Sequence, residues 1–209
     1  LQPLSFLAYT EINVLGRFES GLRHARTLEG LARRAGSQNR LVRGLMLQGR
    51  ALSYLGETTE ALRLSELAVE LSRPPDHRDW HADALNNLGV VHARQGDNRR
   101  AMECFVQGEQ ACGMDIEGLE TRCLILGNQS INLLGLGRAE EALRAAQDVS
   151  RSRLHDTFRT RYYRALANEG TILQENGRLT EALELLGRVL AWSREHVSIE
   201  ILVRTIENV

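Results

Sequence analysis

Residues 84–105 read ALNNLGVVHARQGDNRRAMECF and contain Gly96 near their middle. Residues at helical spacing flank this glycine: Leu85, Leu88, Gly89 and His92 before it, and Ala101, Cys104, Phe105 and Gly108 after it. A glycine ends a helix in the left-handed conformation at little cost, and a small residue such as Ala101 lets two helix axes approach closely. The stretch therefore predicts a helix, a tight turn at Gly96 and a second helix packed against the first.

The turn of this stretch belongs to a nine-residue phrase that occurs five times in the chain. The copies are VLGRFESGL from Val14, YLGETTEAL from Tyr54, RQGDNRRAM from Arg94, GLGRAEEAL from Gly135 and ENGRLTEAL from Glu175. Their glycines, Gly16, Gly56, Gly96, Gly137 and Gly177, lie 40, 40, 41 and 40 residues apart. A fixed period of this kind indicates stacked supersecondary units, so the chain is predicted to be a solenoid.

The repeated unit resembles the tetratricopeptide repeat (TPR), in which an apolar residue and a Leu-Gly pair on the first helix meet Ala and Phe on the second. The matching residues are Leu85, Leu88, Gly89, Ala101 and Phe105. The period exceeds the length of about 34 residues typical of the family, as in versions found in kinesin light chains and bacterial regulators. The resemblance implies an all-α, right-handed superhelical solenoid of antiparallel helix pairs.

We predict a single domain, 1–209, with five repeats and part of a sixth. The repeats are 2–41, 42–81, 82–121, 122–162 and 163–197, followed by 198–209. First helices are expected at 2–15, 42–55, 82–95, 121–136 and 161–176, and second helices at 18–35, 58–72, 98–112, 139–152 and 179–195. Loops are expected at 36–41, 73–81, 113–120 and 153–160, and a last helix from Ser198.

The C-terminal sequence SIEILVRTIENV places Ile199, Leu202 and Ile206 at helical spacing, with no second helix after them to cover this stripe. Solenoids need polar capping elements at their ends. We therefore expect a fragment of a longer protein, or self-association through the C-terminal helix.

Composition excludes several classes of protein. The formal net charge is −1, so no overall field favours nucleic acid, although all 26 basic residues are arginine. No apolar run approaches the roughly 20 residues needed to span a bilayer, and no signal peptide precedes the first repeat. We expect a cytoplasmic protein that binds neither nucleic acid nor membrane through this segment.

No constellation of residues predicts catalysis, a metal or a cofactor. Cys104, Cys112 and Cys123 lack metal-ligand spacing, and HRDWH at 77–81 lacks the glutamate of a zinc-protease helix and is expected in a loop. The repeat already explains the glycines of GLGRAE from Gly135, so a phosphate-binding loop is not needed there. We predict a protein that is not an enzyme.

The resemblance also implies a ligand site, because the first helices of TPR proteins line a concave groove. Asparagines there often hydrogen-bond the backbone of an extended peptide, and Asn87, Asn128 and Asn168 occupy that position here; the alternative is that they face water. The candidate partner-binding residues are Asn87, Asn128, Asn168, Arg43, Arg50, Tyr54, Asn86, Arg94 and Arg164.

Charge varies along this predicted groove. Arg43, Arg50 and Arg94 make its N-terminal half cationic, whereas its middle holds the apolar residues Leu124, Ile131 and Leu134. A protein or peptide with acidic and hydrophobic elements would fit, which predicts a protein- or peptide-binding scaffold. The alternative is a ligand-sensing regulatory domain of a bacterial transcription activator or signalling protein.

Three repeats depart from the pattern at a position where the family has leucine. Gln48, Gln129 and Glu169 stand there. A polar side chain at an apolar interface loses packing, so we expect these interfaces to pack less well.

Overall fold

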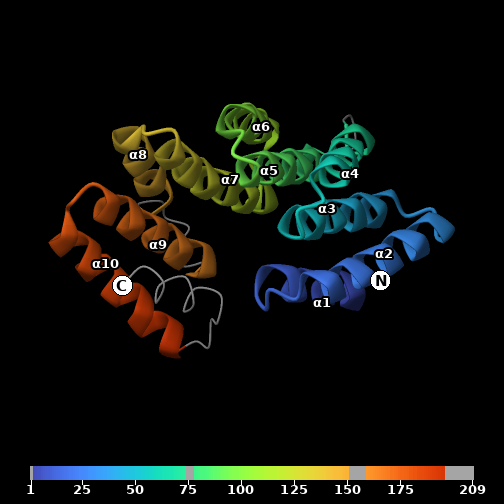
Figure 1. Cartoon of the computed structure of the whole chain (residues 1–209), viewed down its shortest axis with the longest axis horizontal. Helices are drawn as coiled ribbons and strands as arrows, with labels where there is room; N and C mark the ends of the chain where they lie inside the picture. The colour runs from blue at the N-terminus through green and yellow to red at the C-terminus, as the bar shows by residue number, and fades with distance from the viewer. Residues whose placement is uncertain (1, 74–77, 151–158, 196–209) are drawn as a thin grey trace. The chain divides into compact units, whose positions relative to one another are not determined.

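The computed structural model describes residues 2–73, 78–150 and 159–195, which form ten helices and no strand (Figure 1). The first helices of the repeats are α1 (Gln2–Asn13), α3 (Gln38–Tyr54), α5 (Arg78–Arg94), α7 (Ile116–Gly135) and α9 (Arg159–Glu175). The second helices are α2 (Phe18–Arg34), α4 (Thr58–Leu71), α6 (Asn98–Ala111), α8 (Ala139–Ser150) and α10 (Leu179–Glu195). Successive helices pack as antiparallel pairs, so the all-α, TPR-like solenoid is confirmed.

The five phrase glycines form the turns within the helix pairs, as predicted. Their φ angles are 62° at Gly16, 82° at Gly56, 79° at Gly96, 72° at Gly137 and 74° at Gly177. These values lie in the left-handed region, which glycine enters without a Cβ penalty. The local sequence therefore fixes where each first helix ends and each second helix begins.

Three first helices begin at least four residues earlier than predicted, and α9 begins two residues earlier, at Arg159. Helix α3 begins at Gln38 instead of 42, α5 at Arg78 instead of 82, and α7 at Ile116 instead of 121. The expected loops 36–41, 73–81 and 113–120 therefore contain first helical turns. A first turn accepts polar residues because it is exposed and can be capped, as the Asp115 carboxylate caps α7 by accepting from the Gly118 N–H at 2.8 Å.

Two sequence-based expectations fall wholly or partly outside the described residues. The C-terminal stripe of Ile199, Leu202 and Ile206 lies there, as does His77 of the HRDWH segment. The rest of that segment, residues 78–81, forms the start of α5 and is not a loop, so that expectation was wrong.

The contacts divide the chain into two compact units, residues 1–121 and 122–209. In the first unit α3 contacts both α1 and α5, so the first helices lie side by side. Its largest fully buried side chains include Ile12, Leu28, Leu45, Val91 and Phe105. A Cβ on Gly89 would lie 2.6 Å from Phe105 Cε1, which shows that only a glycine fits where α5 meets α6.

The second unit has a smaller core built by the rest of α7 together with α8, α9 and α10. Cys123, Val149 and Ala165 are buried together there, and Tyr163 stacks on Trp192 with ring centroids 4.3 Å apart. Among the described residues, no helix combines the length and apolar character needed to cross a bilayer.

Candidate functional site

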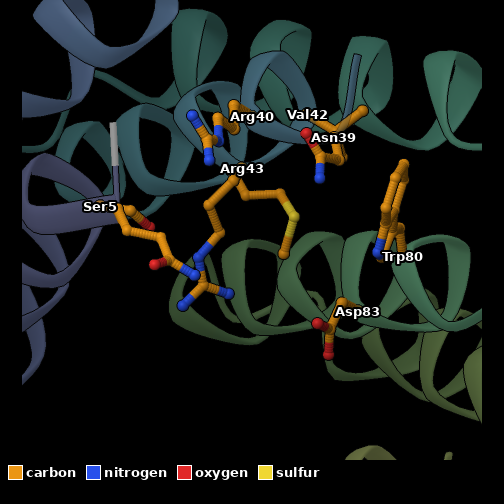
Figure 2. A pocket seen from close by; sticks show the side chains of 9 residues that line it. Ser5, Asn39, Arg40, Val42, Arg43, Trp80 and Asp83 are labelled. Atoms are coloured by element: carbon orange, nitrogen blue, oxygen red, sulfur yellow. The ribbon is translucent and has the colours of Figure 1, made fainter. Parts of the chain in front are cut away.

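A pocket of about 270 Å³ opens on the face of the first unit where α1, α3 and α5 lie side by side (Figure 2). All of its lining residues come from these first helices: Gln2, Ser5, Asn39, Arg40, Val42, Arg43, Met46, Trp80 and Asp83. We call this the α1–α3–α5 pocket. It lies where the sequence predicts the groove, and it contains Arg43 of the predicted set.

Arg40, Asn39 and Trp80 belong to the pocket but were missed in the sequence. They lie in the additional first turns of α3 and α5, which the sequence assigned to loops. Helical spacing could have revealed them, because Arg40 and Trp80 each precede a groove residue, Arg43 or Asp83, by one turn. Because α3 and α5 were predicted to begin too late, these three residues were left out of the candidate site.

The arginines of α3 make the pocket cationic. Helix α3 contains Arg40, Arg43 and Arg50 and no acidic residue. Arg43 lies against the Tyr9 ring of α1, with its Cζ 5.6 Å from the ring centroid, and neither Arg40 nor Arg43 has an ion-pair partner among the described residues. The one acidic residue that lines the pocket is Asp83, whose Oδ1 accepts from the Thr121 hydroxyl at 3.3 Å.

Arg94, near the end of α5, is held by a stack of two aromatic rings. Its Cζ lies 3.6 Å from the Tyr54 ring centroid, and Phe18 stacks on Tyr54 with centroids 4.3 Å apart and an interplanar angle of 5°. Two groups this close to one centroid must lie on opposite faces of the ring. Tyr54 therefore supports Arg94 and has no free ring face for a ligand, whereas Arg94 itself is exposed.

Asn86 and Asn87 of the predicted set are both buried, and whether either contacts a partner stays a prediction. Asn86 is 2% and Asn87 1% exposed. The Asn87 side chain accepts from Arg50 Nε at 3.1 Å and donates to the Ser65 hydroxyl at 3.3 Å, so its amide joins α5 to α3 and α4. Leucine-rich periodicity could not show this, because the partners lie far away in the sequence.

The predicted residues of the second unit are described separately. Asn168 is 7% exposed and donates from Nδ2 to the Gly127 carbonyl at 2.9 Å, which joins α9 to α7. Asn128 and Arg164 are half-buried. On α7, Ile131 is 40% exposed. Whether any of these side chains contacts a partner stays a prediction.

Polar residues at the leucine position bridge helices of neighbouring repeats. Gln48 donates to Glu29 at 2.5 Å, joining α3 to α2. Glu169 accepts from Gln147 at 3.0 Å and from Ser150 at 2.8 Å, joining α9 to α8. These hydrogen bonds satisfy the buried polar groups, and the expectation of poorer packing stays a prediction.

Burial shifts the pKa of three further groups, Cys104, His81 and His92. Burial raises the pKa of Cys104 to about 11, so its thiol stays protonated at neutral pH and is a poor nucleophile. Burial likewise lowers the pKa of His81 and of His92. The described part of the chain contains no group of three His, Cys, Asp or Glu side chains placed to hold a metal ion.

Glu11 is the acidic residue of α1, and it faces α2. Its carboxylate meets His24 Nδ1 at 2.7 Å and accepts from the Ser20 hydroxyl at 2.9 Å. Burial by itself would raise the pKa of Glu11, but the bonds from His24 and Ser20 outweigh it and lower the pKa. The charge of Glu11 is therefore compensated on the α2 side.

Comparison with known proteins gives a family for part of the chain and a fold for nearly all of it. Residues 42–112 match the tetratricopeptide repeat family. The structure is similar to kinesin light chain TPR-like repeats from Podosopora anserina, with a TM-score of 0.63 and 16% identity over 94% of this chain and 95% of that chain. No curated protein matches the sequence significantly.

Two further solved structures are similar to this one. A Rap protein complexed with Competence and Sporulation Factor gives a TM-score of 0.65 at 15% identity, covering 99% of this chain and 62% of that chain. YrrB, described as a TPR protein with an unusual peptide-binding site, gives 0.50 at 16% identity, covering 97% of this chain and 90% of that chain. At these identities the likeness establishes the fold alone.

Proposed function

We propose that this chain, whose residues 42–112 match the tetratricopeptide repeat family, is a binding scaffold that holds an acidic segment of a partner protein in the α1–α3–α5 pocket. The observation that carries the proposal is the charge of the pocket. Helix α3 supplies Arg40 and Arg43 to it without an acidic residue of its own. Two arginines against one acidic lining residue, Asp83, leave a net positive charge, which attracts anionic partners and orients them.

The other lining residues favour a peptide over a small anion. Met46 and Trp80 offer apolar surface beside the arginines, and Ser5 and Asn39 offer hydrogen-bonding groups. A segment that carries a carboxylate next to an apolar side chain would satisfy both kinds of surface. The fold adds support, since Rap is described in complex with Competence and Sporulation Factor and YrrB as having a peptide-binding site.

The test is a peptide array that contains acidic, basic and neutral sequences of matched length and hydrophobicity, probed with the intact chain. We expect retention by acidic sequences. The best of these, labelled with fluorescein, is then titrated by anisotropy against the double variant Arg40→Gln/Arg43→Gln. Removing two half-buried cationic contacts should weaken binding by about tenfold.

The matched control is Arg99→Gln/Arg100→Gln on α6, which removes the same charge outside the pocket. These arginines lie near Glu103 and Asp97, at 3.6 and 3.5 Å. Equal losses in the two double variants, or no preference for acidic sequences, would contradict the proposed site.

A ligand-sensing regulatory domain is the second candidate. It is favoured by the similarity to Rap, which covers 99% of this chain and whose structure contains Competence and Sporulation Factor. Hydrogen exchange with and without the acidic peptide separates the two functions. A scaffold should show protection confined to α1, α3 and α5, whereas a sensor should also change exchange in the second unit.

A further inference from the structure

Arg50 connects three first helices through its guanidinium. It lies half-buried on α3, where Nη1 donates to Asn13 Oδ1 of α1 at 2.9 Å and Nε donates to Asn87 Oδ1 of α5 at 3.1 Å. Asn87 in turn donates to the Ser65 hydroxyl of α4 at 3.3 Å. One side chain thus joins helices from three successive repeats.

The three residues occupy different positions in their repeats. Asn13 lies three residues before Gly16, Arg50 six before Gly56 and Asn87 nine before Gly96. Each step of three residues moves the side chain by about 4.5 Å along its helix axis, or nearly one turn. The row Asn13–Arg50–Asn87 therefore crosses α1, α3 and α5 obliquely. Its two hydrogen bonds can form only while the three helices keep their offset along their axes.

No other repeat can make the same connection from this position. The residues six before the other phrase glycines are Thr10, Val90, Ile131 and Thr171. None has a guanidinium, whose planar set of N–H donors can point at two acceptors on opposite sides. The feature is specific to the repeat that also supplies most of the pocket lining.

The helices that Arg50 joins are the same three that line the α1–α3–α5 pocket. Arg50 is absent from the lining, so it shapes the pocket without forming its wall. We infer that Arg50 is a positioning residue, which holds α1 and α5 against α3 at the spacing and stagger that form the pocket. This inference deepens the proposed function and rests on it for its link to binding.

The first experiment needs no ligand. Amide hydrogen exchange of the intact chain is compared between wild type, Arg50→Lys and Asn13→Ala. Lysine keeps the charge but offers one nitrogen in place of a planar fork, so the bridge between α1 and α5 is lost. We expect the amides of α1 to exchange roughly tenfold faster in both variants, because the bond that restrains its opening is gone.

Both changes remove the bond between Arg50 and Asn13, while Arg50→Lys also removes the bond to Asn87 and Asn13→Ala the bond from Asn13 Nδ2 to the Tyr9 carbonyl at 2.9 Å. The double variant Arg50→Lys/Asn13→Ala should therefore speed α1 exchange by clearly less than the product of the two single effects. The matched control is Arg63→Lys on α4, an exposed arginine paired with Glu60, which should leave α1 exchange unchanged. Wild-type exchange of α1 in Arg50→Lys, or effects that multiply in full in the double variant, would overturn the inference.

The second experiment asks whether positioning affects binding. The acidic peptide chosen from the array is titrated against Arg50→Lys at several salt concentrations. A positioning role predicts about threefold to tenfold weaker binding with an unchanged salt dependence, since the charge is retained. A role as a mere charge predicts wild-type affinity and would overturn the inference. Failure of the wild type to bind any acidic sequence would instead reject the proposed function, and the exchange experiment would still decide the role of Arg50.

Discussion

The two helices of the second repeat carry opposite charges and use arginine differently. Helix α3 contains three arginines and no acidic residue, whereas α4 contains Glu60, Glu66 and Glu70 with the single arginine Arg63. On α4, Arg63 forms an ion pair at 2.6 Å with Glu60 of its own helix. On α3, Arg43 lies over the ring of Tyr9, and Arg50 bonds neutral amides of neighbouring helices.

The arginines of the two helices therefore differ in whether a neighbouring group neutralises their charge. On α4 the carboxylate comes from the local sequence at helical spacing, so the pair has little charge left for a partner. On α3 the contacts come from aromatic rings and amides, which orient a guanidinium without cancelling its charge. The cationic character is therefore a property of α3, and four substitutions test the difference between α3 and α4 and the packing that supports it.

The largest effect is expected from Gly89→Ala, which separates the first and second helices of the third repeat. The new Cβ would lie 2.6 Å from Phe105 Cε1 and 3.1 Å from the Ala101 carbonyl oxygen. Overpacking should lower the free energy of unfolding by about 1–3 kcal/mol, measured by urea denaturation. Gly30→Ala on α2 is the control: a Cβ there meets no atom within 4 Å, so stability should rise by up to about 1 kcal/mol.

Next in size is Tyr54→Leu, which removes the ring that supports Arg94. Loss of the Phe18 stack and of the cation–π contact should cost about 1–2 kcal/mol in the free energy of unfolding. Tyr54→Phe keeps the ring and should stay close to wild type. If the phenylalanine variant lost as much stability as the leucine variant, the hydroxyl rather than the stack would be the stabilising group.

Asn39→Glu would give α3 the kind of pair that α4 has. A glutamate four residues before Arg43 can form an ion pair with it, which should stabilise the helix by about 0.2–0.5 kcal/mol. Affinity for the acidic peptide should fall by about threefold in anisotropy titrations, because Arg43 is then neutralised. Asn39→Gln has the same size without the charge and should bind like wild type; equal weakening would point to lost contacts of Asn39.

The smallest effect concerns pH and the acid of α1. The pKa of Glu11 is lowered from its usual 4.5, so the folded state favours the ionised carboxylate. The resulting stabilisation is present above the unfolded pKa and is lost as pH falls through the lower folded pKa. Glu11→Gln should reduce the acid-induced loss of stability below about pH 4.5, followed by urea denaturation across that range. Identical pH profiles in variant and wild type would show that Glu11 does not contribute.

The repeats, the turns and the identity of the cationic face could all be derived from the sequence. A glycine's left-handed conformation and a helical period are local properties, so Gly56 and its counterparts mark the turns without any knowledge of the fold. The same period placed Arg43 and Arg94 on the first-helix face. The sequence missed the first turns of α3 and α5, because exposed polar turns show no apolar period, and with them Arg40 and Trp80.

The roles of the buried polar residues depended on packing between repeats. Arg50 meets partners 37 residues away in each direction, and Asn168 meets a carbonyl 41 residues away. Which polar groups meet depends on the stagger of neighbouring helices, which no local pattern encodes. The sequence therefore identified the repeats and their charges, whereas the tertiary packing placed Asn87 inside the protein and brought Arg50 between α1 and α5.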